Sequence, residues 1–372
     1  MRAQPLLRHE RLRLRTTSRS ATHATCTAWR APLICLACLA CLACTKPRAE
    51  APPSRGAQDR ATQQAAEHLE ARQRTQRGPH RLVLRYEGLR APESVLYDPR
   101  ADVYLVSNVA GSPFGLGENG FISKLSPDGT MLDAQWIGAG KDGVRLRAPK
   151  GLALDDAHLY VADVDAVRVF DRGTGAPAGV IKVPGAKFLN DVAVAPDGAV
   201  YVTDTGIGPG RGGGSRPDGD AQAIYRVALG SAPVAVAKGS WLREPNGVVA
   251  DAGGLWVVTL GSNELLRVVD GKETARHTLP TGTLDGIVAL DSGRLLISSW
   301  GAATVFEGPP AGPFTPAVEH VDAPADIGFD TKRNRLLVPL FRHDAVEVYD
   351  FAPSAVPASP PIATPPAAAP KP

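Results

Sequence analysis

Residues 190–204, NDVAVAPDGAVYVTD, decide the fold of this 372-residue chain. The stretch begins with a polar residue and continues as a short apolar strand. A turn containing Asp, Pro and Gly then leads into a second strand with paired apolar residues. Alternating apolar residues bounded by turn residues predict two antiparallel strands joined by a tight turn.

The same pattern recurs along the chain with a regular period. The six copies begin at Glu93, Lys150, Asn190, Asn246, Asp285 and Asp326. Each first residue stands 10 or 11 positions before the residue that anchors its second strand, and these anchors are Tyr104, Tyr160, Tyr201, Trp256, Leu296 and Leu337. Two further strands follow in most copies, so the 270 residues from 81 to 350 give 45 residues and four strands per unit. This period and strand count indicate the blade of a β-propeller.

We therefore predict an all-β, six-bladed β-propeller over residues 81–351, with four antiparallel strands per blade. The last unit supplies only three strands, and residues 81–86 (RLVLRY) precede the first unit with no other partner. We expect this strand to complete the last blade, because pairing the two ends of the ring hides an open sheet edge. Two packed β-sandwiches would not explain a pattern repeated in register six times.

The regions outside the propeller differ from it in composition. Ala31–Cys44 is a 14-residue apolar run after an Arg-rich, acid-poor stretch, and all five cysteines lie at or before Cys44. Residues 1–44 resemble a bacterial lipoprotein signal, which implies export and lipidation of Cys44, although Cys41 stands where leucine is usual three positions earlier. An organelle transit peptide or a mistranslated extension is the alternative. We expect residues 45–80 to form a polar linker and residues 352–372 a disordered Pro/Ala-rich tail.

Charge and cysteine content exclude several functions. Residues 1–44 hold seven arginines and one glutamate, a net +6, so a total of +3 leaves −3 for the rest. A weakly acidic body without a basic run disfavours nucleic acid as a partner. We expect a monomer whose membrane contact is limited to the lipid anchor. The body has no cysteine, no HExxH spacing and no GxSxG motif, which disfavours thiolate, zinc-peptidase and serine-hydrolase chemistry.

The six polar residues that open the copies are the candidate functional site. Inner strands line the channel of a propeller, so Glu93, Lys150, Asn190, Asn246, Asp285 and Asp326 should converge at one end of the axis. Asn-Gly and Asp-Gly pairs also suit simple turns, but Glu93 and Lys150 are poor turn residues. The sequence alone leaves open a shared ion or ligand site and a polar, water-filled channel.

The chain resembles the gluconolactonase, regucalcin and luciferin-regenerating-enzyme family of six-bladed propellers over roughly residues 81–350. The resemblance is carried by Pro92-Glu93-Ser94, Leu189-Asn190-Asp191, Pro245-Asn246-Gly247 and Leu284-Asp285-Gly286. It implies that Glu93, Asn190, Asn246 and Asp285 bind a divalent metal and that Asp285 is also the general base. Carboxylate and amide oxygens are hard ligands, so Ca²⁺ is the most favoured ion, with Mg²⁺, Mn²⁺ or Zn²⁺ as alternatives.

Other residues depart from that family or support the site. The sugar-lactone enzymes of the family have an arginine where this chain has Phe188, which puts sugar-lactone specificity in doubt. Lys150 and Asp326 are outside the family's metal set; Lys150 is expected to pair with Asp326 or to hold an anionic substrate. Asp163 and Asp204 end second strands and either orient ligands or cap turns. Trp256 and Trp300 are expected to be core residues.

These observations predict an exported, metal-binding propeller with lactonase-like hydrolase activity on a small-molecule substrate. The alternative is a non-catalytic ligand-binding or scaffold propeller at the cell surface, in which the metal is structural. The fold hosts many functions and does not choose between the two.

Overall fold

The computed structural model describes residues 80–138, 140–210 and 214–352. The expected signal with Cys44, nearly all of the linker over 45–80 and of the tail over 352–372 lie outside these residues. In the described ranges no helix is long and apolar enough to cross a membrane. The helices there are two short 3₁₀ turns, η1 (Lys141–Gly143) and η2 (Ser240–Leu242).

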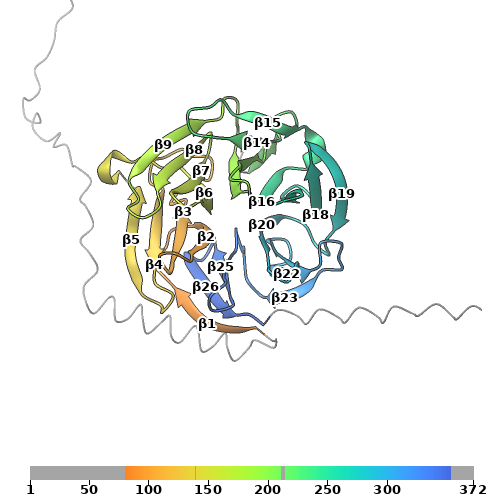
Figure 1. The fold of residues 1–372 in the computed structure, drawn as a ribbon. Helices are drawn as coiled ribbons and strands as arrows, with labels where there is room; N and C mark the ends of the chain where they lie inside the picture. Colours follow the sequence, from red (N-terminus) through yellow and green to blue (C-terminus); the bar gives the residue numbers. More distant parts are fainter. Residues whose placement is uncertain (1–79, 139, 211–213, 353–372) are drawn as a thin grey trace, which may run out of the picture. The chain divides into compact units, whose positions relative to one another are not determined.

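Six four-stranded antiparallel sheets are arranged in a ring around a central axis in the described part of the chain (Figure 1). Blade 1 consists of β2 (Pro92–Asp98), β3 (Val103–Asn108), β4 (Phe121–Leu125) and β5 (Met131–Gly138). Blade 2 consists of β6 (Pro149–Leu154), β7 (His158–Asp163), β8 (Ala166–Asp171) and β9 (Pro177–Lys182). Blade 3 consists of β10 (Leu189–Val194), β11 (Val200–Asp204), β14 (Ala223–Val227) and β15 (Val234–Lys238). A small hairpin, β12 (Ile207–Pro209) and β13 (Ser215–Pro217), extends from blade 3.

The second half of the ring repeats the arrangement. Blade 4 consists of β16 (Pro245–Asp251), β17 (Gly254–Thr259), β18 (Glu264–Val269) and β19 (Lys272–Thr278). Blade 5 consists of β20 (Leu284–Ala289), β21 (Leu295–Ser299), β22 (Thr304–Gly308) and β23 (Thr315–Glu319). Blade 6 consists of β24 (Gly328–Asp330), β25 (Arg335–Leu340), β26 (Ala345–Asp350) and β1 (Arg81–Tyr86). The predicted six-bladed propeller is therefore confirmed.

The ring closes as the sequence predicted, by pairing of β1 with β26 in the last blade. Their antiparallel register joins Arg81 to Asp350 and Tyr86 to Val346. Leu82 of β1 is fully buried in the core of blade 6 beside Leu336 and Tyr349. Apolar burial thus supports the backbone pairing at the closure.

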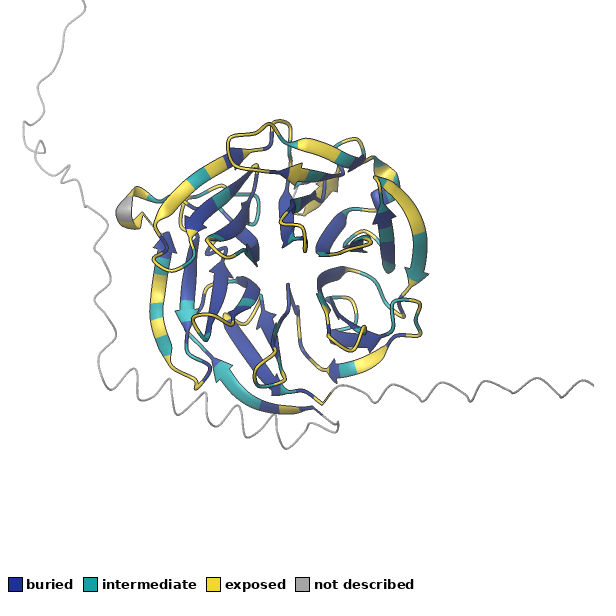
Figure 2. Ribbon diagram, in the orientation of Figure 1, coloured by how far each residue is buried: buried dark blue, intermediate teal, exposed yellow. Residues whose placement is uncertain are grey.

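The hydrophobic core lies between successive blades. Figure 2 shows buried inner strands and outer strands that alternate between exposed and covered residues. Leu105 of blade 1 and Leu159 of blade 2 share one cluster, and the other blades repeat this contact. A buried ion pair adds to the first junction, since the Arg172 guanidinium donates to both carboxylate oxygens of Asp98 at 2.5 and 3.1 Å. Stacking of blades therefore buries faces that a single sheet would leave in water.

Candidate functional site

Five of the six predicted residues meet in one cavity of about 540 Å³ at the channel end where the inner strands begin. Its floor holds polar side chains that are each at most 7% exposed, and these are Glu93, Lys150, Asn190, Asn246 and Asp285. Its walls are mainly apolar and aromatic, and include Val109, Pro113, Phe114, Phe188, Ile207, Leu260, Trp300 and Phe341. The repeated sequence pattern thus places five polar side chains on the floor of a cavity whose walls are mainly apolar.

Irregular pairing at the start of each inner strand places these side chains. The register between inner and second strand shifts between Pro92 and Ser94, and again between Pro245 and Val248. The pairing register of β6, β10 and β20 with their second strands shifts at the equivalent place. Irregularities of this kind redirect a side chain out of the regular alternation of a strand. Each floor residue lies within such a shift.

The glycines after the floor residues serve close packing of neighbouring inner strands. A Cβ on Gly247 would lie 2.3 Å from the carbonyl oxygen of Asp285, and one on Gly151 would lie 2.2 Å from a carboxylate oxygen of Asp191. These glycines are needed because another backbone approaches them closely. Asn246-Gly247 is thus part of an inner strand and not a turn.

The hydrogen bonds of the two asparagines fix which amide atom faces the cavity. Asn246 Nδ2 donates to the Leu284 carbonyl at 3.2 Å, and a carbonyl can only accept. The Thr205 hydroxyl donates to the Pro245 carbonyl at 2.9 Å, so it accepts from Asn190 Nδ2 at 3.0 Å. Both amide nitrogens are bonded to the frame, which leaves the amide oxygens as the uncommitted ends.

The two carboxylates differ in how far they are satisfied. Glu93 Oε2 is buried and has no hydrogen-bond partner among the described residues. Burial, followed by the negative charge of Asp285, raises the pKa of Glu93 well above its ordinary value. Asp285 accepts from Asn246 Nδ2 at 3.0 Å and from Trp300 Nε1 at 2.5 Å. Burial nevertheless raises the pKa of Asp285 to about 7.

Lys150 brings a buried positive charge to the same floor. Its ammonium donates to the Ala148 carbonyl at 3.1 Å and lies 4.1 Å from the centre of the Phe188 ring. Burial lowers its pKa to about 8, while the nearby Glu93 carboxylate opposes that shift.

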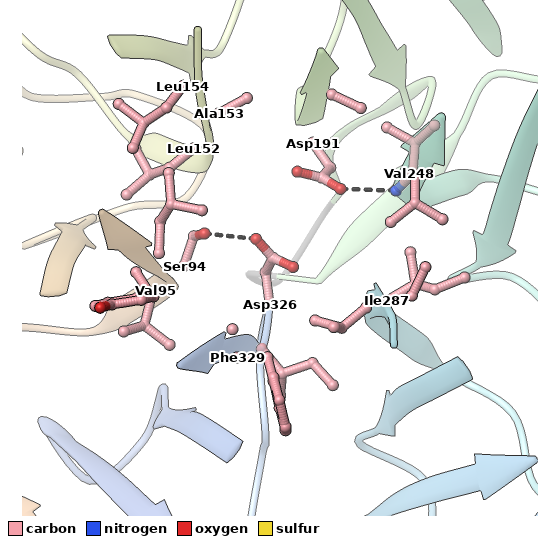
Figure 3. A pocket seen from close by; sticks show the side chains of 18 of the residues that line it. Ser94, Val95, Leu152, Ala153, Leu154, Asp191, Val248, Ile287, Asp326 and Phe329 are labelled. Carbon is pink, nitrogen blue, oxygen red and sulfur yellow. Dashed lines mark hydrogen bonds between the residues drawn. The ribbon is translucent and has the colours of Figure 1, made fainter. Parts of the chain in front are cut away.

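Asp326 does not join the other five, which corrects the prediction of six converging residues. It lines a second cavity of about 480 Å³ toward the other ends of the inner strands, together with Ser94 and Asp191 (Figure 3). Asp326 accepts from the Ser94 hydroxyl at 2.5 Å, and in the described chain Lys150 forms no ion pair with it. The expected Lys150–Asp326 pair is therefore wrong.

Strand geometry explains this division into two cavities. The position of each residue along its inner strand decides which cavity it lines. Glu93 and Asn190, near the strand starts, line the first cavity, and the residues that follow them, beginning with Ser94 and Asp191, line the second. The Asp326 amide donates to the Glu93 carbonyl at 2.8 Å, which sets Asp326 beside Ser94.

Asp163 and Asp204 position the floor without touching it. Asp163 Oδ1 accepts from the backbone amides of Arg147 and Ala148, just before β6. Asp204 accepts from the amides of Lys187 and Phe188, just before β10. The two aspartates hold the segments that lead into inner strands and also carry Phe188 to the cavity wall.

Two partners of the floor were missed from the sequence. Trp300 was expected to be a core residue, yet its indole lines the cavity and bonds to Asp285. Thr205 follows directly after β11 and carries no motif of its own. The one sequence feature that could have predicted their hydrogen bonds to the floor is that each residue directly follows the second strand of its blade.

The donor set suits a hard divalent cation. Glu93 Oε2 lacks a partner, the amide oxygens of Asn190 and Asn246 are uncommitted, and each carboxylate oxygen of Asp285 keeps a second lone pair. No group of three or more His, Cys, Asp or Glu that could hold a metal ion by itself occurs in the described ranges. Any cation held here would thus depend on amide oxygens, as oxygen-liganded Ca²⁺ often does.

Fold and floor together define a six-bladed propeller with an axial polar cavity, and known structures share the fold. No protein-family model and no curated protein sequence matches the chain. A gluconolactonase from Xanthomonas campestris is 21% identical, with a TM-score of 0.54 over 71% of this chain and 87% of that one. A provisionally assigned gluconolactonase is 20% identical, with a TM-score of 0.55 over 73% and 91%. Virginiamycin B lyase from Staphylococcus aureus is 14% identical, with a TM-score of 0.52 over 73% and 100%. Gluconolactonases are thus among the similar structures, as the sequence resemblance implied, and at these identities the likeness establishes the fold.

Proposed function

We propose that the chain is a divalent-metal-binding propeller that hydrolyses lactone-type esters in its axial cavity. The observation that carries this proposal is the convergence of Glu93, Asn190, Asn246 and Asp285 on one floor, with Glu93 Oε2 lacking a partner. The gluconolactonase named among the similar structures supports the reaction class. The lyase among them shows that the fold alone does not choose the reaction.

The residues of the floor have distinct roles in this proposal. Glu93, Asn190, Asn246 and Asp285 would hold the cation, with Ca²⁺ as the favoured ion. A bound divalent cation would polarise the carbonyl of an ester. Asp285 would accept the proton of the attacking water, held in orientation by Asn246 and Trp300. The apolar walls would limit the access of further water.

A hydrolysis assay with a matched variant tests the proposal. Dihydrocoumarin and glucono-δ-lactone serve as substrates, with Ca²⁺ or with chelator. We expect Asp285→Asn to lower turnover by roughly 10²- to 10⁴-fold, the usual effect of losing a general base. Asp156→Asn, an exposed aspartate in the β6–β7 turn, should leave turnover unchanged. Parent-rate hydrolysis by Asp285→Asn, or by protein in chelator, would refute the proposal.

The non-catalytic alternative rests on two hydrogen bonds to Asp285. Both oxygens of Asp285 already accept hydrogen bonds from the frame, as expected for a ligand of a structural metal. In that case a chelator lowers the thermal stability, and no lactone is turned over under any condition.

We further propose that the protein is exported and lipidated at Cys44, as the apolar run ending at that residue suggests. Labelling with a palmitate analogue in a bacterial host should be lost in Cys44→Ser and kept in Cys41→Ser. Equal labelling of both variants would refute it.

A further inference from the structure

Lys150 is an unusual residue for the floor of this cavity. Only 1% of it is exposed, and its ammonium has one hydrogen-bond acceptor, the Ala148 carbonyl, among the described residues. An ammonium has three donors, and no described carboxylate forms an ion pair with it. Placing such a charge out of water is costly unless an anion compensates it.

The cation of the proposed function makes this charge more unfavourable. With a divalent ion bound, Glu93 and Asp285 would supply two negative charges that neutralise it. Lys150 would then add one positive charge to the floor, while the nearest further carboxylates, Asp191 and Asp326, line the second cavity. A negatively charged ligand group is the simplest way to satisfy the remaining ammonium donors.

The rest of the ligand is indicated by the walls. The rings of Phe114 and Phe188 pack at a tilt on one side, with centroids 5.3 Å apart, and those of Trp300 and Phe341 do the same on another side, with centroids 5.4 Å apart. The two pairs come from blades 1 and 3 and from blades 5 and 6, so they enclose the space above the floor. Such walls offer mainly aromatic and apolar contacts. Their polar side chains are Ser215 and Arg342, and the Arg342 guanidinium lies 5.2 Å from the centre of the Trp300 ring.

Phe188 connects the two features. The Lys150 ammonium lies 4.1 Å from the centre of the Phe188 ring, which helps to fix the position of the charge. The same ring packs against Phe114 in the cavity wall. The Asp204 carboxylate holds the Phe188 amide at 2.9 Å and thereby fixes the segment that carries the ring. The cavity thus has the Lys150 ammonium at its base, and aromatic walls above on which Arg342 supplies a second cation.

We infer that this cavity accepts a small organic anion, a carboxylate joined to an aromatic or apolar body, and that Lys150 selects its charge. The assignment rests on the cavity of the proposed function, but it does not require lactone turnover. It predicts a substrate or ligand class different from polyhydroxylated sugar lactones.

Binding of a matched pair of probes tests this assignment. Titration calorimetry of the whole protein in Ca²⁺ compares 3-phenylpropanoate with the neutral 3-phenylpropanamide, and gluconate serves as a polar anion. A hydrogen bond to a charged group contributes about 1.5–3 kcal/mol, so we expect the acid to bind roughly 10- to 100-fold more tightly than the amide. Gluconate should bind more weakly than 3-phenylpropanoate, because it cannot use the aromatic walls.

Variants assign the preference to Lys150. Lys150→Met should bind acid and amide equally, and Lys150→Arg should retain the preference for the acid. Lys187→Met removes an exposed lysine next to Phe188 and should behave as the parent. A cooperative thermal transition shows that each variant is folded; if Lys150→Met is not, Lys150→Gln replaces it.

Several results would overturn the assignment. These are equal binding of acid and amide by the parent, no binding of either, tighter binding of gluconate, or a preference that survives Lys150→Met or Lys150→Gln. If neither neutral variant folds, the parent's response to the three probes decides. Calcium binding without acid preference would refute this assignment alone, whereas acid preference without lactone turnover would refute only the proposed hydrolase.

Discussion

Replacing Glu93 by glutamine should change stability in opposite directions with and without a divalent ion. Glu93 is 7% exposed, and its Oε2 atom has no partner among the described residues. A buried polar group without a partner costs about 1–3 kcal/mol, and more when charged. In Glu93→Gln no charge can form at this position and an amide donor lies near Asp285, so the metal-free variant should be more stable by about 1–3 kcal/mol.

The same change should remove the response to calcium. A ligand at 100 times its dissociation constant stabilises the folded state by about 2.7 kcal/mol. For a domain of this size, 1 kcal/mol shifts the melting temperature by about 2–4 °C. The parent should therefore gain about 5–11 °C when saturated with Ca²⁺, and Glu93→Gln should gain almost nothing at the same concentration.

Differential scanning calorimetry in chelator and in a calcium series measures both effects. Glu319→Gln makes the same chemical change at an exposed position on the outer strand β23 and should follow the parent in both conditions. A Glu93→Gln protein that is less stable in chelator and keeps the full calcium shift would refute the reasoning. That result would mean that the carboxylate is satisfied by the protein and does not bind the ion.

Three further predictions concern the frame. Asp98→Asn should destabilise the protein by about 3–5 kcal/mol, because it leaves the Arg172 charge unpaired between blades 1 and 2. Urea unfolding measures this change in the free energy of unfolding, and a loss below about 0.5 kcal/mol would contradict the prediction. Although burial alone would raise it, the pKa of Asp98 is lowered by hydrogen bonds from Arg172 and backbone amides. The stabilisation by ionised Asp98 is therefore present above pH ~4, the unfolded pKa, and is lost as the pH falls through the lower folded pKa. The stability of Asp98→Asn should consequently depend less steeply on pH in the acid range than that of the parent. An unchanged pH profile would contradict this. Leu82→Ala should cost about 2–5 kcal/mol by opening a cavity at the ring closure, whereas alanine at exposed Leu132 of β5 should cost under 1 kcal/mol in the same denaturation assay.

The sequence was sufficient to predict the blades, the closure and most of the floor, because these depend on periodicity. Strand period and turn residues repeat in every copy, so the channel positions of Glu93, Asn190, Asn246 and Asp285 follow from counting. The same counting was wrong for Asp326. In blade 6 the inner strand is only Gly328–Asp330, and Asp326 lies before it, bonded to the backbone of blade 1.

Hydrogen bonds between side chains were beyond such counting. Trp300, just after β21, donates to Asp285 of β20 within blade 5, and Thr205 of blade 3 links Asn190 to the Pro245 carbonyl of blade 4. These bonds depend on how side chains and neighbouring blades approach one another in three dimensions. No local pattern around Trp300 distinguishes a wall residue of the cavity from a core residue, so its role needed coordinates.

The pairing of β1 with β26 also sets an order of events during synthesis. Arg81 and its partner Asp350 are separated by 269 residues, so the ribosome makes one strand of the last blade first and its neighbour last. At about 5–20 residues per second, the early strand waits roughly 13–54 s for a partner. During that time its Leu82 side chain has no core to enter. The exposed strand is then a natural target for a chaperone, and the ring can close only after Asp350 has been made.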